Sequence, residues 1–370
     1  MQAFPALDPI PLPAPVWLFV VLHTVTLALH FFAVHFLVGG LTLATIWSIW
    51  GRLRKNSVLL NASGLIAHRL PVVMTYVINF GVPPLLFTQV LYGRALYTSS
   101  VLIGVWWISV VALLMISYSS LYLMSRSADR NRFSGWAGLI ALVVVLKIGM
   151  IYSANMTLML RPDLWVEIYR TSPRGLTLGF GDPTVMPRWL FMMLGSIGVC
   201  GIALVFLSLK SNMAEGVGPF LRKWAGRLIA AFTVVQIGIG IWVYRAQPAA
   251  VQEGLTEGIF YRACAVLWLV TAVALVALGG IMSMKSTATW KSATVLALAS
   301  FVNVVSMVLV RDGIRFVSLD LAGFNVWDQA VSTNWSTVIL FLVLFVAGIG
   351  VMGWLISVVA KAKPVDERYA

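Results

Sequence analysis

The feature that most constrains this chain is a series of nine apolar runs, each long enough to cross a bilayer. A transmembrane helix needs roughly 20 mostly apolar residues. Runs that meet this criterion cover residues 16–49, 66–92, 98–124, 134–158, 188–209, 225–245, 259–283, 289–310 and 335–360. Only 11% of the residues are charged, against about 25% in a soluble protein. The sequence therefore predicts an all-α membrane protein, a single transmembrane domain (1–370) folded as a nine-helix bundle in the lipid bilayer.

Basic residues in the short connections predict the orientation of this bundle, because cytoplasmic loops are enriched in Lys and Arg. The clusters that acids do not balance are Arg52, Arg54, Lys55 and Arg69; Arg126, Arg130 and Arg132; Lys210, Arg222, Lys223 and Arg227; Lys285 and Lys291; and Lys361, Lys363 and Arg368. They fall on one side only with an odd number of helices. We therefore expect the N-terminus outside (N-out) and the C-terminus in the cytoplasm (C-in) of a bacterial inner membrane. The net charge of +13 then reflects topology, and no nucleic acid partner is expected.

Three of the four histidines lie on the first run, in LHTVTLALHFFAVHFLVGG. At 100° per residue, His23 and His30 share a helix face, and His35 points about 140° away from His30. A neutral imidazole inside a bundle is a typical ligand of b-type haem, and the alternative is an interhelical hydrogen bond. His68, in the first turn of the second predicted helix, is too far in depth to pair with His35. A methionine at suitable depth is an alternative second ligand, and these are Met150, Met156, Met159, Met192, Met193 and Met307.

Two other features of the runs point to buried polar chemistry. Lys147 lies near the middle of the fourth run, too deep to reach water easily, and no acid lies in the middle of any predicted span. We expect its partner to be a hydroxyl, a carbonyl, a haem propionate, a quinone oxygen, a lipid or another subunit; otherwise it is buried neutral. Pro83 and Pro84 should kink the second helix and line a cavity, because proline frees backbone carbonyls.

Three segments resemble the main subunit of cytochrome bd quinol oxidases: VHFLVGGLTL, INFGVPPLLFTQVLYGRALYTSS and KIGMIYSANMTLMLRPDLW. The resemblance covers roughly residues 16–165. It implies a high-spin b haem whose iron is bound by His35. The residues themselves make His23, His30, His68 and Lys147 further cofactor-binding candidates. The chain also differs from that family. VLIGVWWISVVALLM has no Glu for a catalytic haem, no His follows His68, and the long quinol loop after the sixth helix is missing. The resemblance therefore does not imply oxygen reduction.

These observations favour a membrane electron-transfer subunit that binds haem b. It would exchange electrons between quinone or quinol and a partner cytochrome, or another membrane or periplasmic redox subunit. A haem-free quinone-binding anchor of a redox complex and a transporter or channel are the alternatives. Whether the chain is an enzyme, as part of a quinol-dependent oxidoreductase complex, is left open, because no soluble catalytic motif can be assigned.

Overall fold

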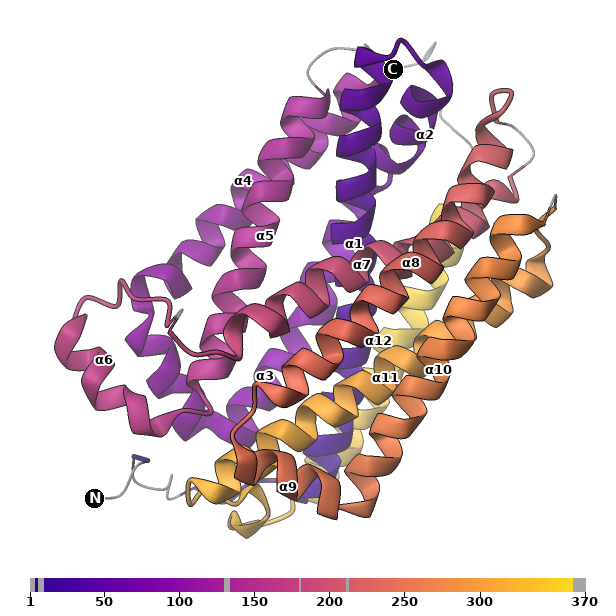
Figure 1. Ribbon diagram of the computed structural model, residues 1–370. Helices are drawn as coiled ribbons and strands as arrows, with labels where there is room; N and C mark the ends of the chain where they lie inside the picture. The colour runs from indigo at the N-terminus through magenta and orange to yellow at the C-terminus, as the bar shows by residue number, and fades with distance from the viewer. Residues whose placement is uncertain are drawn as a thin grey trace.

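The computed structural model describes residues 4–5, 10–129, 134–179, 181–210, 213–285 and 287–361. Within these ranges, nine helical segments are long and apolar enough to span a membrane, which confirms the predicted all-α membrane fold (Figure 1). The long helices are α1 (Val16–Leu53), α3 (Leu70–Leu102), α4 (Gly104–Asp129), α5 (Ser134–Leu158), α7 (Val185–Ser208), α8 (Val217–Arg245), α10 (Ile259–Met284), α11 (Trp290–Leu321) and α12 (Trp335–Lys361). The basic residues Arg130, Arg132, Lys363 and Arg368 lie outside the described ranges.

Short helices mark the two ends of the bundle. The helices η1 (Pro162–Leu164), α6 (Trp165–Thr171), α9 (Ala249–Glu257) and η2 (Val326–Asp328) connect long helices at one end, and α2 (Ser57–Ala67) lies at the other. We call these the α6–α9 end and the α2 end. The α6–α9 end is the one that the basic residues predict to face outside, and the orientation stays a prediction.

Helix α1 is the centre of the packing. Its 38 residues extend about 57 Å, well beyond the roughly 30 Å of the hydrocarbon layer, and it packs against α2, α3, α5, α7 and α11. Small residues allow the closest approaches, as is common between membrane helices. A Cβ atom added at Gly39 would lie 2.2 Å from the Ser196 carbonyl oxygen of α7. At the α8–α10 interface, a Cβ at Gly226 would lie 2.5 Å from the Gly279 carbonyl oxygen.

Two helices end about ten residues later than the sequence predicted. Helix α3 continues through Pro83 and Pro84 to Leu102, with a non-helical conformation at Tyr92 (φ −131°, ψ 24°). Side chains also bond the backbone near the prolines: the Thr88 hydroxyl donates to the Pro84 carbonyl at 2.7 Å. Helix α11 runs to Leu321 rather than 310, so a stretch of charged residues that follows the apolar run is part of the bundle.

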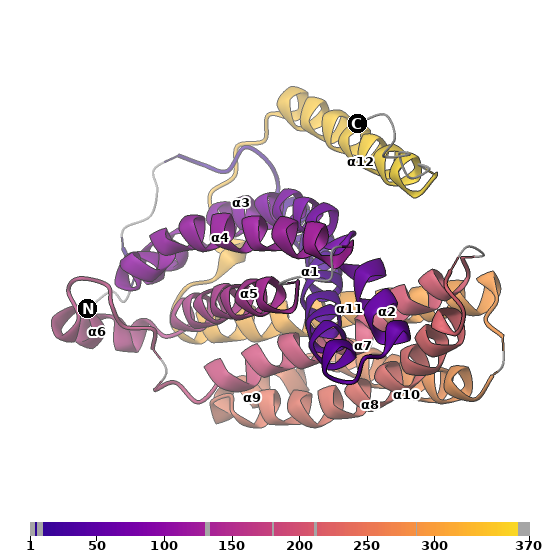
Figure 2. The same cartoon turned by 90° about the horizontal axis from the view of Figure 1, so that it is seen from above.

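Helix α12 lies to one side of the other helices (Figure 2). It contacts them through its first turns, where Val338 packs in one cluster with Leu18, Leu22 and Phe87. Most of its remaining side chains are exposed and apolar. Such a surface suits a lipid-facing helix.

Ion pairs order the connection between α5 and α7 at the α6–α9 end. The Arg161 guanidinium contacts both Asp163, at 2.8 Å, and Asp182. The hydrogen bond from Arg161 holds the pKa of the Asp163 carboxyl below its usual range. These pairs involve groups outside the long helices, where charge is inexpensive.

Candidate functional site

A cavity of about 430 Å³ lies mainly among α1, α3, α5, α7 and α11, within the 300–1,000 Å³ that small-molecule sites typically occupy. It follows α1 from His23 to Val38, about 22 Å along the helix. Its lining is mostly aliphatic, aromatic and thioether, and the methionines on it are Met74, Met156, Met192, Met193 and Met307. Pro84 also lines it, which confirms the cavity expected beside the two prolines, while the break in the helix lies further on, at Tyr92.

His30 is the histidine whose ring is free to bind an occupant of this cavity. Its Nδ1 lies 3.0 Å from the Val77 carbonyl oxygen of α3. Because a carbonyl only accepts, Nδ1 carries the proton, and the neutral ring then keeps a lone pair on Nε2. Nε2 has no hydrogen-bond partner among the described residues, and the ring lines the cavity. Gly81 makes room for it, since a Cβ there would lie 2.8 Å from His30 Cε1.

His23 shares the cavity-facing side of α1, as the 100° periodicity predicted, but both of its nitrogens are engaged. Nδ1 lies 3.2 Å from the Pro84 carbonyl oxygen, and Nε2 lies 2.8 Å from Arg315 Nη1. Arg315 also donates to Asp312 at 3.0 Å, and Thr24 donates to the same carboxylate at 3.2 Å. The Nε2 lone pair of His23 therefore accepts a hydrogen bond from Arg315, which is itself paired with Asp312, and is not free to bind another group.

His35 and His68 do not line the cavity. His35 is fully buried, and neither of its ring nitrogens has a hydrogen-bond partner among the described residues. His68 follows α2 near the opposite end of the bundle, is exposed, and lies 3.2 Å from the Ser125 hydroxyl through Nδ1. Of the four candidate histidines, the structure therefore brings together His23 and His30.

Lys147 is also not among the residues that line the cavity, and its contact is not one that the sequence suggested. Its Nζ lies 4.0 Å from the centre of the Trp106 ring of α4. The Trp106 indole is itself fixed, because its N–H donates to the Leu176 carbonyl at 2.6 Å. A cation over an indole face is a favourable arrangement, so this contact stabilises the half-buried lysine within the described structure.

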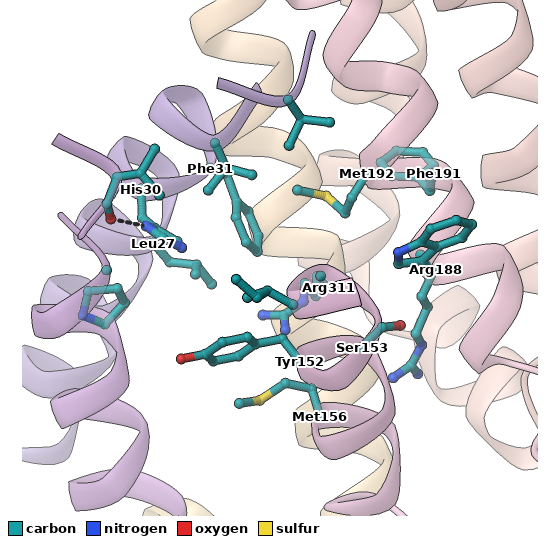
Figure 3. A pocket seen from close by; sticks show the side chains of 18 of the residues that line it. Leu27, His30, Phe31, Tyr152, Ser153, Met156, Arg188, Phe191, Met192 and Arg311 are labelled. Carbon is teal, nitrogen blue, oxygen red and sulfur yellow. Dashed lines mark hydrogen bonds between the residues drawn. The ribbon is translucent and has the colours of Figure 1, made fainter. Parts of the chain in front are cut away.

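Three arginines line the cavity and were missed by the sequence analysis. Arg188 comes from the first turn of α7, and Arg311 and Arg315 come from the end of α11. Figure 3 shows His30 and Arg188 on opposite sides of the view, with Arg311 between them. Arg311 and Arg315 immediately follow an apolar run and were assigned to a loop. Arg315 lies three residues after Asp312 and four after Arg311, and this helical spacing was the available signal.

No protein-family model and no curated protein matches this sequence. The structure is similar to a chain of the bd oxidase from Geobacillus thermodenitrificans, with a TM-score of 0.71 and 11% sequence identity, over 96% of this chain and 100% of that chain. A likeness at this identity shows the fold. The resemblance that the three sequence segments predicted is confirmed at that level: this multi-pass membrane protein has the fold of a bd oxidase chain.

Proposed function

We propose that this protein is an electron-transfer subunit of a bacterial cytoplasmic membrane that binds a b-type haem in the cavity. It would pass electrons between quinone or quinol and a partner cytochrome or another redox subunit. The observation that carries the proposal is His30, with Nδ1 bonded to a backbone carbonyl and Nε2 open to an apolar cavity. The fold shared with a bd oxidase chain supports a redox role.

The residues around the cavity fit a haem. His30 would bind the iron through Nε2, and the Val77 carbonyl would fix the ring, as ligand histidines usually require. Apolar side chains would cover the macrocycle, and the thioethers of Met156, Met192, Met193 and Met307 are further soft donors on the lining. A bound haem would supply one-electron chemistry, with a potential set by the axial ligand and by burial.

The structure changes which histidine we propose as the ligand. The sequence resemblance pointed to His35, whose ring does not line the cavity. His23 is on the lining, but Arg315 occupies its Nε2. No carboxylate belongs to the described lining residues, and the sequence lacks the third-helix Glu of the oxidase family, so we propose electron transfer rather than oxygen reduction.

A pyridine haemochrome assay of the purified protein, with a reduced-minus-oxidised spectrum, tests the proposal. We expect a b-type signal that His30→Ala abolishes, while His35→Ala and the exposed control His68→Ala keep it. A colourless wild-type protein would refute the proposal that the protein binds haem. Loss of the signal in His35→Ala but not in His30→Ala would show that His35, and not His30, binds the haem iron.

A haem-free quinone site is the second candidate, and the same cavity gives it a specific basis. His30, Tyr152, Ser153 and Arg311 are among the few polar groups on a mostly apolar lining, as recognition of a quinone would require. A colourless protein that binds a quinone analogue, and loses this binding in His30→Ala, would favour this function over the first.

A further inference from the structure

The cavity carries more positive than negative charge. Arg188, Arg311 and Arg315 line it, and Asp312 is ion-paired with Arg315, so three guanidinium groups face one carboxylate. Asp182 attracts Arg188 electrostatically but is ion-paired with Arg161. Uncompensated charge inside a bundle is energetically unfavourable. The cavity is therefore suited to an occupant that carries negative charge.

Arg311 is the arginine with the most unused hydrogen-bonding capacity. Its guanidinium carbon lies 5.4 Å from the centre of the Phe31 ring, so an aromatic ring covers one face. None of its N–H groups has a hydrogen-bond or ion-pair partner among the described residues, and the side chain lines the cavity. Arg315, in contrast, is occupied by Asp312 and His23.

Arg188 is held in place by residues from two other segments. Its Nη1 lies 3.4 Å from the Thr157 hydroxyl and its Nη2 lies 3.1 Å from Gln247 Oε1. The Gln247 amide is oriented in turn, because its Nε2 donates to the Val243 carbonyl at 2.8 Å. These partners are neutral, so they position the guanidinium without neutralising it.

We infer that Arg188 and Arg311 form a carboxylate-binding pair, and that the cavity takes an apolar molecule with one or two carboxylates. The long apolar lining beside His30 fits the body of such a molecule, and planar guanidinium groups bind carboxylates through paired N–H groups. Two sources have this chemistry: the propionates of a haem and the head group of a fatty acid. The haem source rests on the proposed function, and the fatty acid source does not.

The test compares acids with their esters on the wild-type protein in detergent, so that it needs no variant to fold. Binding of haem b and of its dimethyl ester is measured by quenching of tryptophan fluorescence, since Trp189 and Trp268 line the cavity. Parinaric acid and its methyl ester form the second pair, followed by their own fluorescence. We expect one acid to bind roughly 10- to 100-fold more tightly than its ester, because charge-assisted hydrogen bonds have this effect.

Variants then assign the preference to the arginines. Arg311→Gln and Arg188→Gln should weaken binding of the acid and leave binding of the ester unchanged, whereas the exposed control Arg170→Gln should keep the full preference. Equal affinity of acid and ester in both pairs would overturn the inference. Haem binding through His30 without acid preference would overturn it and leave the proposed function standing. If the protein binds no haem but prefers parinaric acid to its ester, the carboxylate-binding pair is supported and haem binding is refuted.

Discussion

Replacing Asp312 by asparagine should destabilise the folded protein by about 3 kcal/mol, and replacement by alanine by about 5 kcal/mol. The Asp312 and Arg315 side chains are each only 4% exposed, and their charged atoms lie 3.0 Å apart. At an effective dielectric constant of about 20, such a pair attracts by roughly 5 kcal/mol. Asparagine keeps an oxygen that can accept from Thr24, so its cost lies at the lower end. Alanine removes this acceptor as well as the charge, so Arg315 is left buried with no polar group at position 312.

Reversible unfolding in mixed micelles, with increasing sodium dodecyl sulfate, gives the free energy of each variant. Arg315→Gln and the double variant Asp312→Asn/Arg315→Gln complete a double-mutant cycle. The double variant should be more stable than the sum of the single effects by about 2 kcal/mol, because neither partner is then left as an unpaired charge. Asp320→Asn is the matched control, since Asp320 is exposed on the same helix; it should change stability by less than about 0.5 kcal/mol.

Strictly additive single effects would refute this reasoning. They would mean that the ion pair is not the unit that keeps charge inside the bundle. An Asp312→Asn variant as stable as the wild type would refute it as well, because a buried arginine would then tolerate the loss of its counter-charge.

Three further predictions follow from close contacts. Gly81→Ala should reduce haem retention roughly 10-fold or more, measured as haem per protein, because a Cβ would lie 2.8 Å from the His30 ring. Gly39→Ala should cost roughly 1–3 kcal/mol in the same unfolding assay, because a Cβ would lie 2.2 Å from a carbonyl oxygen of α7. Arg161 lowers the folded-state pKa of Asp163, so this pair stabilises above the unfolded pKa of about 3.9 and is lost as pH falls through the lower folded value. Hydrogen exchange of the segment after α5 should rise over that acidic range, and Asp163→Asn should remove this pH dependence.

Each of these three predictions has a control and a contrary result. Gly348→Ala is the control for both glycine variants, because nothing lies within 4 Å of a Cβ at that position. Unchanged haem content in a folded Gly81→Ala variant would argue against His30 as the ligand. A Gly39→Ala variant as stable as Gly348→Ala would show that α1 and α7 can separate without cost. Exchange that rises equally with and without Asp163 would assign the acid effect to other carboxylates.

The number and type of the helices could be predicted because the bilayer leaves little choice. A segment that crosses hydrocarbon must satisfy its own backbone, so an apolar run of sufficient length is helical. The fourth run, 134–158, coincides with α5. The helix ends at Leu102 and Leu321 could not be read in the same way. Prolines and charged residues usually end a membrane helix, and here His23 and Thr24 of α1 contact the Pro84 carbonyl and the Asp312–Arg315 pair.

The candidate site was predictable in part. Helical periodicity placed His23 and His30 on one face, and both line the cavity. Which of them has a free nitrogen depends on partners from α3 and α11, namely the Val77 and Pro84 carbonyls and Arg315. These contacts join residues far apart in the sequence, and no local pattern encodes them. The motif around His35 carried the family resemblance but not this information.

The three histidines of α1 have different roles because of what surrounds them rather than what they are. Arg315 needs an acceptor inside the bundle, and His23 provides one beside Asp312. The network that allows charge to stay in α11 is therefore the same one that removes His23 from the candidate ligands. His30, about two turns further along the same face of α1, donates to a carbonyl that only accepts, and this contact fixes the tautomer that leaves Nε2 available. An imidazole at membrane depth thus identifies a ligand only once the partners of both nitrogens are known.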